Sequence, residues 1–415
     1  MMTGNTNSKI AFAHLTSRLR QTLVATMSVT FGISMYIFMN GFMNGVNNIQ
    51  ADLSFSTMAH IRVYNDLPED RTNLLKQHTN PDQVINIRNA KVIQYTDGIK
   101  NSEKILDRLK KQPEITGVTP QVNINVFYRN GAIKINGVLS GIEVDSEDRL
   151  FKTSTFVQQG SWNDLSYRTD GTIIGAGLAK KMSLKLNDNL VVSTADGVTK
   201  SFRIIGIFKT TIAGVDNTKA YIKINSARQL LSENSSFVTD VQVNIRDYSK
   251  AREVADKLAS SIPYKVEAWQ VANGQMEATT ELRNILAMAV SMTILIVAGF
   301  GIYNIMNMTV NEKIREIAIL KAMGFEGNDI VQIFLLQSLV IGIIGGTAGI
   351  VFGFLISTAV NHIPFQVATL QTLPMTFYLK DYTLSFIFGM LTTFIAGYLP
   401  AKKASTIDPV IIIRG

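Results

Sequence analysis

Cysteine is absent from this chain of 415 residues, and charged residues are missing from several long stretches. The lack of cysteine excludes disulfides, thiolate metal ligands and a lipid-modified N-terminal cysteine. Residues 21–51, 284–311 and 382–401 contain no Asp, Glu, Lys, Arg or His, and 330–379 contain only His362 from this set. A helix crosses a bilayer with about 20 apolar residues. The sequence therefore predicts an α-helical membrane protein with four transmembrane helices, one plus three, over 21–47, 284–310, 330–360 and 382–401.

Charge is sparse, at 17% of residues, and the net charge is +8. No Lys/Arg-rich run with interleaved aromatics appears, so we expect no nucleic-acid partner. A basic balance in a membrane protein reflects cytoplasmic flanks and contact with anionic membrane lipid. The first apolar stretch is longer than the core of a typical signal peptide, and it lacks a convincing cleavage site, which favours an uncleaved anchor.

The distribution of Lys and Arg beside the spans predicts the topology. The positive-inside rule counts these residues in short flanks. They occur in the N-terminal segment 1–20, in 311–324 and in the tail 402–415, whereas the loop 361–381 has only Lys380. We therefore place the first three segments in the cytoplasm. The loop and the large region 48–281 are predicted to be extracytoplasmic.

The region 48–281 alternates short strands and helices, which predicts an α+β domain. Alternating apolar and polar residues indicate strands, and apolar residues three or four apart indicate helices. We interpret 149–237 as a β-rich insertion that interrupts a β-α-β module. Residues 66–80 are polar and predict a loop. The expected strands are 60–64, 122–128, 132–141, 190–193, 201–208, 220–224, 241–245 and 265–268, with helices at 101–111, 175–182, 226–231 and 251–260.

The sequence contains few patterns that are typical of catalytic, metal-binding or nucleotide-binding sites. Its four histidines are scattered without metal-ligand spacing. No Gly-x-Ser-x-Gly motif appears, and the sequence lacks the Gly-Lys-[Ser/Thr] core of a phosphate-binding loop. We therefore expect no catalytic residue, no metal site and no cofactor bound by this chain.

A row of glycines runs along the predicted third span. The spacing of four residues places them on one face, where small residues let helices approach closely in lipid. This predicts helix packing, either within the chain or across a dimer; ordinary glycine enrichment in spans is the alternative. The glycines are Gly342, Gly345, Gly346, Gly349 and Gly353.

The segment 311–324 is the most specific motif. It combines apolar residues at helical spacing with mixed charges, and Gly324 suits a helix C-terminus. An amphipathic helix directly after a span can lie on the membrane or dock in a groove of a partner protein. The mixed charges favour a protein partner over anionic lipid.

This motif resembles the coupling helix of ABC-transporter permeases of the MacB/FtsX/Lol type. Three further features agree: the basic amphipathic segment Arg18-Leu-Arg-Gln-Thr-Leu23 that leads into the first span, the C-terminal stretch 398–409 with its Pro-Ala and Asp-Pro pairs, and the layout of one span, a large domain and three spans. The resemblance covers essentially the whole chain. It implies a bacterial inner-membrane permease with a MacB-like periplasmic domain that works with an ABC ATPase subunit.

Two details resemble the lipoprotein-releasing permeases LolC and LolE. One is Met39-Asn-Gly-Phe-Met43 at the end of the first span, and the other is the series Trp269, Asn273, Met276 and Glu281 before the second. One departure concerns the hook with which one Lol subunit captures a periplasmic carrier. The matching hairpin, 195–200, is short and lacks proline. Either this chain corresponds to the other subunit, or it does not bind a carrier directly.

The resemblance implies a permease that pairs with a second permease, as a homodimer or heterodimer, and releases lipoproteins from the inner membrane by mechanotransmission. ATP and Mg²⁺ would be bound by the partner ATPase. Efflux in the manner of MacB, with an adaptor, and FtsX-like signalling to a periplasmic partner stay open as alternatives. The expected ATPase contacts are Glu312, Arg315, Glu316, Ile317, Leu320, Lys321 and Gly324. The expected contacts with substrate acyl chains are Met35, Phe38, Met39 and Phe42.

Overall fold

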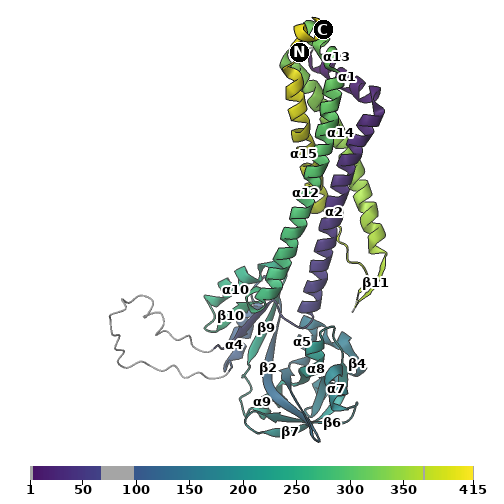
Figure 1. Ribbon diagram of the computed structural model, residues 1–415. Helices are drawn as coiled ribbons and strands as arrows, with labels where there is room; N and C mark the ends of the chain where they lie inside the picture. The colour runs from purple at the N-terminus through teal and green to yellow at the C-terminus, as the bar shows by residue number, and fades with distance from the viewer. Residues whose placement is uncertain (1–2, 67–97, 368–369, 415) are drawn as a thin grey trace, which may run out of the picture. The chain divides into compact units, whose positions relative to one another are not determined.

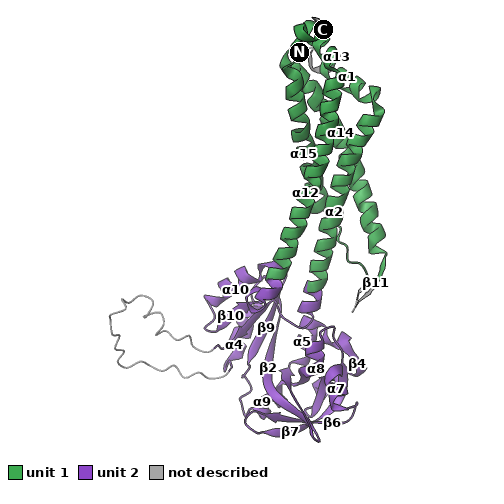
Figure 2. Ribbon diagram, viewed as in Figure 1, with its two compact units in different colours: residues 1–50, 278–415 green, residues 51–277 purple. Residues whose placement is uncertain are grey.

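The computed structural model describes residues 3–66, 98–367 and 370–414 (Figure 1). The chain divides into two compact units (Figure 2). Unit 1 comprises residues 1–50 and 278–415, and unit 2 comprises residues 51–277. The polar loop expected over 66–80 lies outside the described residues, apart from Asp66.

Unit 1 is helical. Among the described residues, four helices are long and apolar enough to cross a membrane, which confirms the predicted arrangement of one plus three spans. The second span is part of a helix that begins ten residues before the predicted start, because residues 274–283 are polar but lack a helix-breaking proline. The long helices are α2 (Leu19–Phe55), α12 (Gly274–Glu312), α14 (Gly327–Asn361) and α15 (Leu379–Ser405). The shorter ones are α1 (Thr3–Ser17), α13 (Ile314–Ala322) and α16 (Pro409–Arg414).

The glycine row of α14 lies at contacts within the chain. A Cβ added at Gly349 would lie 2.8 Å from the Cβ of Ile33 on α2, and one added at Gly345 would lie 2.7 Å from that of Val29. Gly353 also faces α2, whereas Gly342 faces α15 and Gly346 lies against both helices. Hydroxyl groups support the close approach, since Thr30 Oγ1 donates to Gly345 O at 3.1 Å and Ser34 Oγ donates to Gly349 O at 3.0 Å. The row therefore joins three helices of one chain.

The later part of α2 also packs against the extended segment that precedes α15. A Cβ at Gly45 would lie 2.4 Å from the carbonyl oxygen of Pro374, so only glycine fits there. Gly41 O accepts hydrogen bonds from both the backbone N–H and the hydroxyl of Thr376, each at 3.0 Å. Asn44 Nδ2 donates to Asp381 Oδ2 at 3.0 Å. The expected loop 361–381 is therefore partly fixed against α2, and it also contains the short strands β11 (Pro364–Val367) and β12 (Leu370–Thr372).

Unit 2 is built on one mixed sheet. Its described strands follow the order β10-β1-β9-β2-β3-β8-β5-β7-β4, and β6 pairs with β2 and β7. The β3–β8 and β5–β7 pairs are parallel, and the others are antiparallel. The strands are β1 (Ile61–Tyr64), β2 (Ile115–Asn130), β3 (Ile133–Ile142), β4 (Val157–Gly160), β5 (Gly171–Gly175), β6 (Asn189–Thr194), β7 (Thr199–Phe208), β8 (Lys219–Lys223), β9 (Asp240–Ile245) and β10 (Lys265–Ala268).

Helices cover this sheet and close its core. The β-rich segment 149–237 supplies β4 to β8, and these strands continue the sheet instead of forming a second one. A single large apolar cluster includes side chains from both parts, such as Val243 of β9 and Phe202 of β7. The helices are α4 (Ser102–Lys110), α5 (Val144–Phe151), α6 (Asp164–Tyr167), α7 (Ala176–Met182), α8 (Ala213–Thr218), α9 (Ile224–Leu230), α10 (Ala251–Ala259) and α11 (Trp269–Ala272), with 3₁₀ turns at 153–156 and 248–250.

A buried carboxyl group lies beneath the sheet. Glu147 on α5 is 1% exposed, and its two carboxyl oxygens accept from Gln121 Nε2 at 2.8 Å each. Burial raises the pKa of Glu147, although Lys219 and the hydrogen bonds oppose that shift. The folded unit therefore holds a proton on Glu147 at pH values where the unfolded chain has released it.

We expect Glu147→Gln to stabilise unit 2 at neutral pH. Stability should fall as pH rises above about 4.5, the ordinary pKa of this group, because the unfolded chain then releases a proton that the folded unit keeps. Glutamine keeps a carbonyl for Gln121 and removes that charge. Thermal unfolding of the full chain across this pH range, followed by tryptophan fluorescence, tests the prediction, because both tryptophans lie in unit 2. Glu103→Gln, at an exposed position on α4, is the control. An unchanged pH slope in the Glu147 variant would contradict the assignment.

Candidate functional site: the helix between the second and third spans

The helix α13 follows α12 after a break at a single residue. Lys313 adopts φ −94° and ψ 12°, outside the helix, and its ammonium donates to Glu316 Oε2 at 2.8 Å. Glu312 is the last residue of α12, so it does not lie on α13. At the other end Gly324 takes φ +100°, a left-handed conformation that ends the helix, as the sequence predicted.

One side of α13 is buried. Ile317 is 1% exposed and Ala318 is fully buried, and both lie within unit 1. Leu320 is partly buried against the apolar cluster of unit 1 that contains Ile317. Lys321 Nζ donates to the carbonyl oxygens of Ser405 and Ile407, at 2.9 and 2.7 Å. These cationic hydrogen bonds satisfy carbonyls at the C-terminal end of α15.

The N-terminal helix α1 holds α13 from another side. The buried residues Asn7, Ala11 and Leu15 recur at every fourth position, so one face of α1 packs inside unit 1. His14 Nδ1 lies 2.9 Å from Gln337 Nε2, and His14 Nε2 lies 3.4 Å from Glu316 Oε2. The amide nitrogen of Gln337 donates to Nδ1, which leaves the ring hydrogen on Nε2.

The electrostatics of this contact favour a neutral histidine. Burial lowers the pKa of His14, and the Lys313 ammonium lowers it further. The pKa of Glu316 is lowered chiefly by its hydrogen bond from Lys313. Glu316 is therefore an anion that accepts from Lys313 and from a neutral imidazole. A similar contact joins α1 and α2 to α12, since Arg18 forms an ion pair with Glu312 and Gln21 Nε2 donates to it at 3.1 Å.

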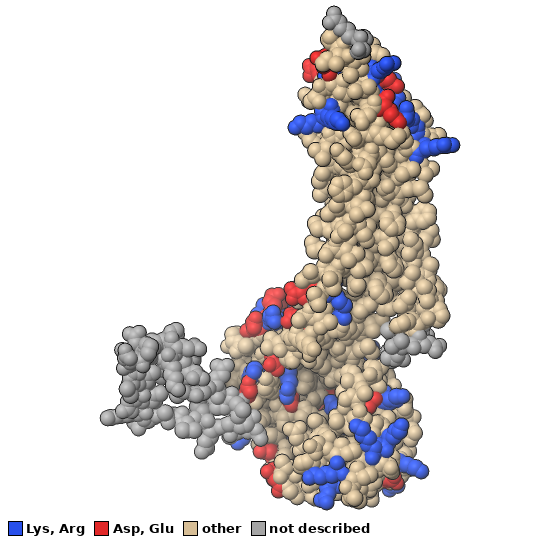
Figure 3. Space-filling view, in the orientation of Figure 1, with Lys and Arg blue, Asp and Glu red and all other residues tan. Residues whose placement is uncertain are grey.

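The opposite side of α13 is open to solvent. Arg315, Ile319 and Met323 recur at every fourth position, so they share one face. Ile319 is 52% exposed and Met323 is 66% exposed. Figure 3 shows charged side chains gathered at the end of unit 1 that holds α13, whereas the surface of the spanning helices is almost uncharged. We call Arg315, Ile319 and Met323 the α13 face.

The structure thus separates the predicted contact residues into two groups. Arg315, Glu316 and Gly324 are exposed. Ile317 is buried in unit 1, whereas Leu320 and Lys321 are half-buried and pack against it or bond to it. Glu312 is exposed at the end of α12 and is paired with Arg18. Ile319 and Met323, which share the exposed face with Arg315, were not among the predicted contacts, although their spacing of four residues from Arg315 was a usable signal.

The predicted acyl-contact residues lie on one helix. Met35, Phe38, Met39 and Phe42 are all half-buried on α2. The rings of Phe38 and Phe42 are nearly parallel, with centroids 6.3 Å apart. They are apolar side chains of a candidate membrane span, next to the glycines that contact the segment before α15. Among the described residues no group of three or more His, Asp or Glu side chains could hold a metal ion.

Known proteins match this chain along most of its length. The family described as MacB-like periplasmic core domain matches residues 22–261, and the family described as FtsX-like permease C-terminal matches residues 288–409. The four spans and the periplasmic domain define a multi-pass inner-membrane permease. The chain belongs to the MacB/FtsX/Lol family of ABC-transporter permeases.

Three curated relatives illustrate which kinds of family member this chain resembles. The lipoprotein-releasing protein LolE of Haemophilus influenzae is 24% identical, covering 75% of this chain and 79% of that protein. LolC of Neisseria meningitidis is 25% identical, over 80% and 86% of the two chains. The macrolide export ATP-binding/permease protein MacB of Psychrobacter cryohalolentis is also 25% identical, over 72% of this chain. This chain covers 46% of that MacB. These similar identities define the family without choosing between its activities.

Proposed function

We propose that this protein is the permease subunit of a transporter that releases lipoproteins from the inner membrane toward the outer membrane. An ABC ATPase would hydrolyse ATP, with Mg²⁺, on its own chain. A second permease, identical or different, would complete the membrane part. The observation that carries the proposal is α13: it is tied to α1 and to the end of α15 on one side, and it presents an apolar and cationic face on the other.

These ties support a mechanism of mechanotransmission. An ATPase that moved on ATP binding would push on the α13 face. Because Lys321 and Glu316 bond α13 to α15 and α1, the helix should carry the surrounding helix ends with it. The chain itself then needs no catalytic group. Substrate acyl chains would meet the half-buried methionines and phenylalanines of α2, where flexible Met side chains suit varied lipid.

The test is depletion of this protein, followed by separation of inner and outer membranes. Outer-membrane lipoproteins should accumulate in the inner membrane. Normal sorting after verified depletion would refute lipoprotein release and would favour the alternatives of the family. Loss of macrolide resistance would then indicate efflux with an adaptor, and altered activity of a periplasmic cell-wall hydrolase would indicate signalling.

A further inference from the structure

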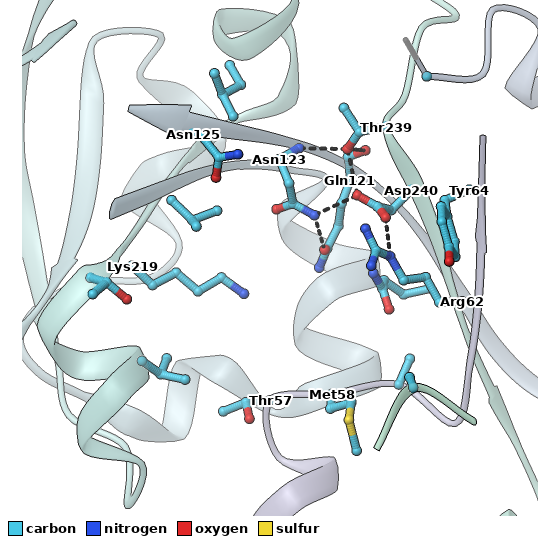
Figure 4. Close-up of a pocket in the computed structure, with 18 of the residues that line it drawn as sticks. Thr57, Met58, Arg62, Tyr64, Gln121, Asn123, Asn125, Lys219, Thr239 and Asp240 are labelled. Carbon is cyan, nitrogen blue, oxygen red and sulfur yellow. Dashed lines mark hydrogen bonds and ion pairs between the residues drawn. The ribbon is translucent and has the colours of Figure 1, made fainter. Parts of the chain in front are cut away.

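A cavity of about 1140 Å³ lies within unit 2 (Figure 4). It is larger than the roughly 300–1,000 Å³ of typical small-molecule sites. Part of its lining is one face of the sheet, with Gln121, Asn123 and Asn125 of β2 alternating along that strand. Residues of the same face come from β9 and β1, including Asp240 and Arg62. This face of the sheet offers hydrogen-bonding groups to a polar ligand.

Part of the lining is held rigid by its own hydrogen bonds. Asp240 is 1% exposed and accepts from Asn123 Nδ2 at 2.9 Å and from Thr239 Oγ1 at 2.7 Å. Arg62 forms an ion pair with the same carboxylate. Asn123 Nδ2 also donates to Gln121 Oε1 at 3.1 Å. These partners satisfy one another, so this part of the cavity is a fixed wall.

Two donors beside that wall are not satisfied in this way. Asn125, Val138 and Lys219 are neighbours across three strands, because Asn125 pairs with Val138 and Val138 pairs with Lys219. Figure 4 shows the Lys219 side chain extended into the cavity. Within the described part of the chain, Lys219 forms no ion pair, although its ammonium interacts with Tyr221 and lies 4.8 Å from that ring centroid. The Asn125 carboxamide forms no hydrogen bond among the described residues. Three further acids line the cavity. Asp66 and Glu267 lie near Lys265, at 2.5 and 3.9 Å, and Asp196 is exposed at the turn between β6 and β7.

The charge of Lys219 is retained. Burial lowers the pKa of this ammonium, but Tyr221 and Glu147 raise it by more, so it lies above its ordinary value. The donors beside the fixed wall are therefore the Lys219 ammonium, the Asn125 carboxamide and the outer N–H groups of Arg62, whose side chain is 46% exposed. Donors of this kind recognise a ligand rich in carbonyl and carboxylate oxygens.

We propose that this cavity binds an extended, acidic polypeptide segment, with a carboxylate of that segment on Lys219 and a backbone carbonyl on Asn125. The size of the cavity favours several residues over a small anion. Sugar rings are disfavoured because the aromatic lining is already engaged: Arg62 lies 4.5 Å from the ring centroid of Tyr64, and Trp269 packs on Phe55 at 5.4 Å. The identity of this ligand rests on the proposed function: it is the hydrophilic polypeptide that follows the acylated end of a lipoprotein.

The test uses the purified full chain in detergent and a short fluorescent peptide in which aspartate and serine alternate. Fluorescence anisotropy should show binding that weakens about tenfold when asparagine replaces aspartate in the peptide, since a charge-assisted hydrogen bond is lost. Lys219→Gln should weaken binding similarly, and Lys219→Arg should retain most of it. Lys181→Gln, the same change at an exposed position on α7, is the matched control.

The outcomes separate this proposal from the proposed function. No peptide binding, or equal binding by wild type and Lys219→Gln, overturns the cavity proposal even if depletion still disturbs lipoprotein sorting. Displacement of the peptide by a neutral oligosaccharide at lower concentration would also overturn it, in favour of a glycan site. Peptide binding that depends on Lys219, together with normal sorting after depletion, would support the cavity and refute lipoprotein release.

Discussion

Gly349→Leu is expected to prevent α2 from packing against α14 and to reduce sharply the amount of folded protein in the membrane. A Cβ at this position would lie 2.8 Å from Ile33 Cβ and 3.0 Å from the backbone oxygen of Thr30. Leucine adds further atoms where even alanine is too large. Overpacking of this kind costs about 1–3 kcal/mol when side chains can move. The cost should be higher here because backbone is involved and Ser34 would lose its bond to Gly349 O.

The measurement is the yield of monodisperse protein in detergent, together with its midpoint of thermal unfolding. Val351→Leu is the matched control, since Val351 lies two residues away on the same helix and is 56% exposed. It should behave as wild type. If Gly349→Leu were equally well folded but failed to form a permease dimer, the glycine row would serve an interface between chains, and the intrachain assignment would be wrong.

The sequence predicted the spans well because the physical signal is strong. A run of about 20 uncharged residues has few alternatives to a membrane helix. Periodicity also located β1, β9, α4 and α10, whose buried faces follow the expected spacing. The turn at 196–197 was readable because Asp-Gly favours hairpins, and Gly197 does take φ +86°.

Other elements could not be predicted from local pattern. β5 was missed because Gly171–Gly175 is short and fully buried, so no alternation marks it. The partner of the glycine row was undetermined, because spacing shows that a face is small without showing what lies against it. On α13, Ile317 was expected to meet a partner, but it faces the interior. An amphipathic pattern identifies two faces, and only the packing of α1, α14 and α16 decides which face is covered.

Because the other face of α13 is covered within unit 1, substitutions on the α13 face test coupling to the ATPase most directly. Ile319→Glu and Met323→Glu are expected to abolish co-purification of the ATPase and the stimulation of its activity, while the permease itself stays folded. Both side chains are more than half exposed, so the substitutions leave the core of unit 1 intact. A buried apolar contact at the centre of an interface is worth about 2 kcal/mol or more, and an unpaired carboxylate there costs further.

The controls follow from the same geometry. Lys402→Glu changes charge at an exposed position near the end of α15 and should leave coupling intact. Glu316→Lys would not isolate the α13 face, because it would place a second cation beside Lys313 and His14 and disturb α1. Glu316→Gln keeps the acceptor and should couple nearly normally. Full ATPase stimulation by Ile319→Glu and Met323→Glu would show that the ATPase docks elsewhere, and the proposed role of α13 would fall.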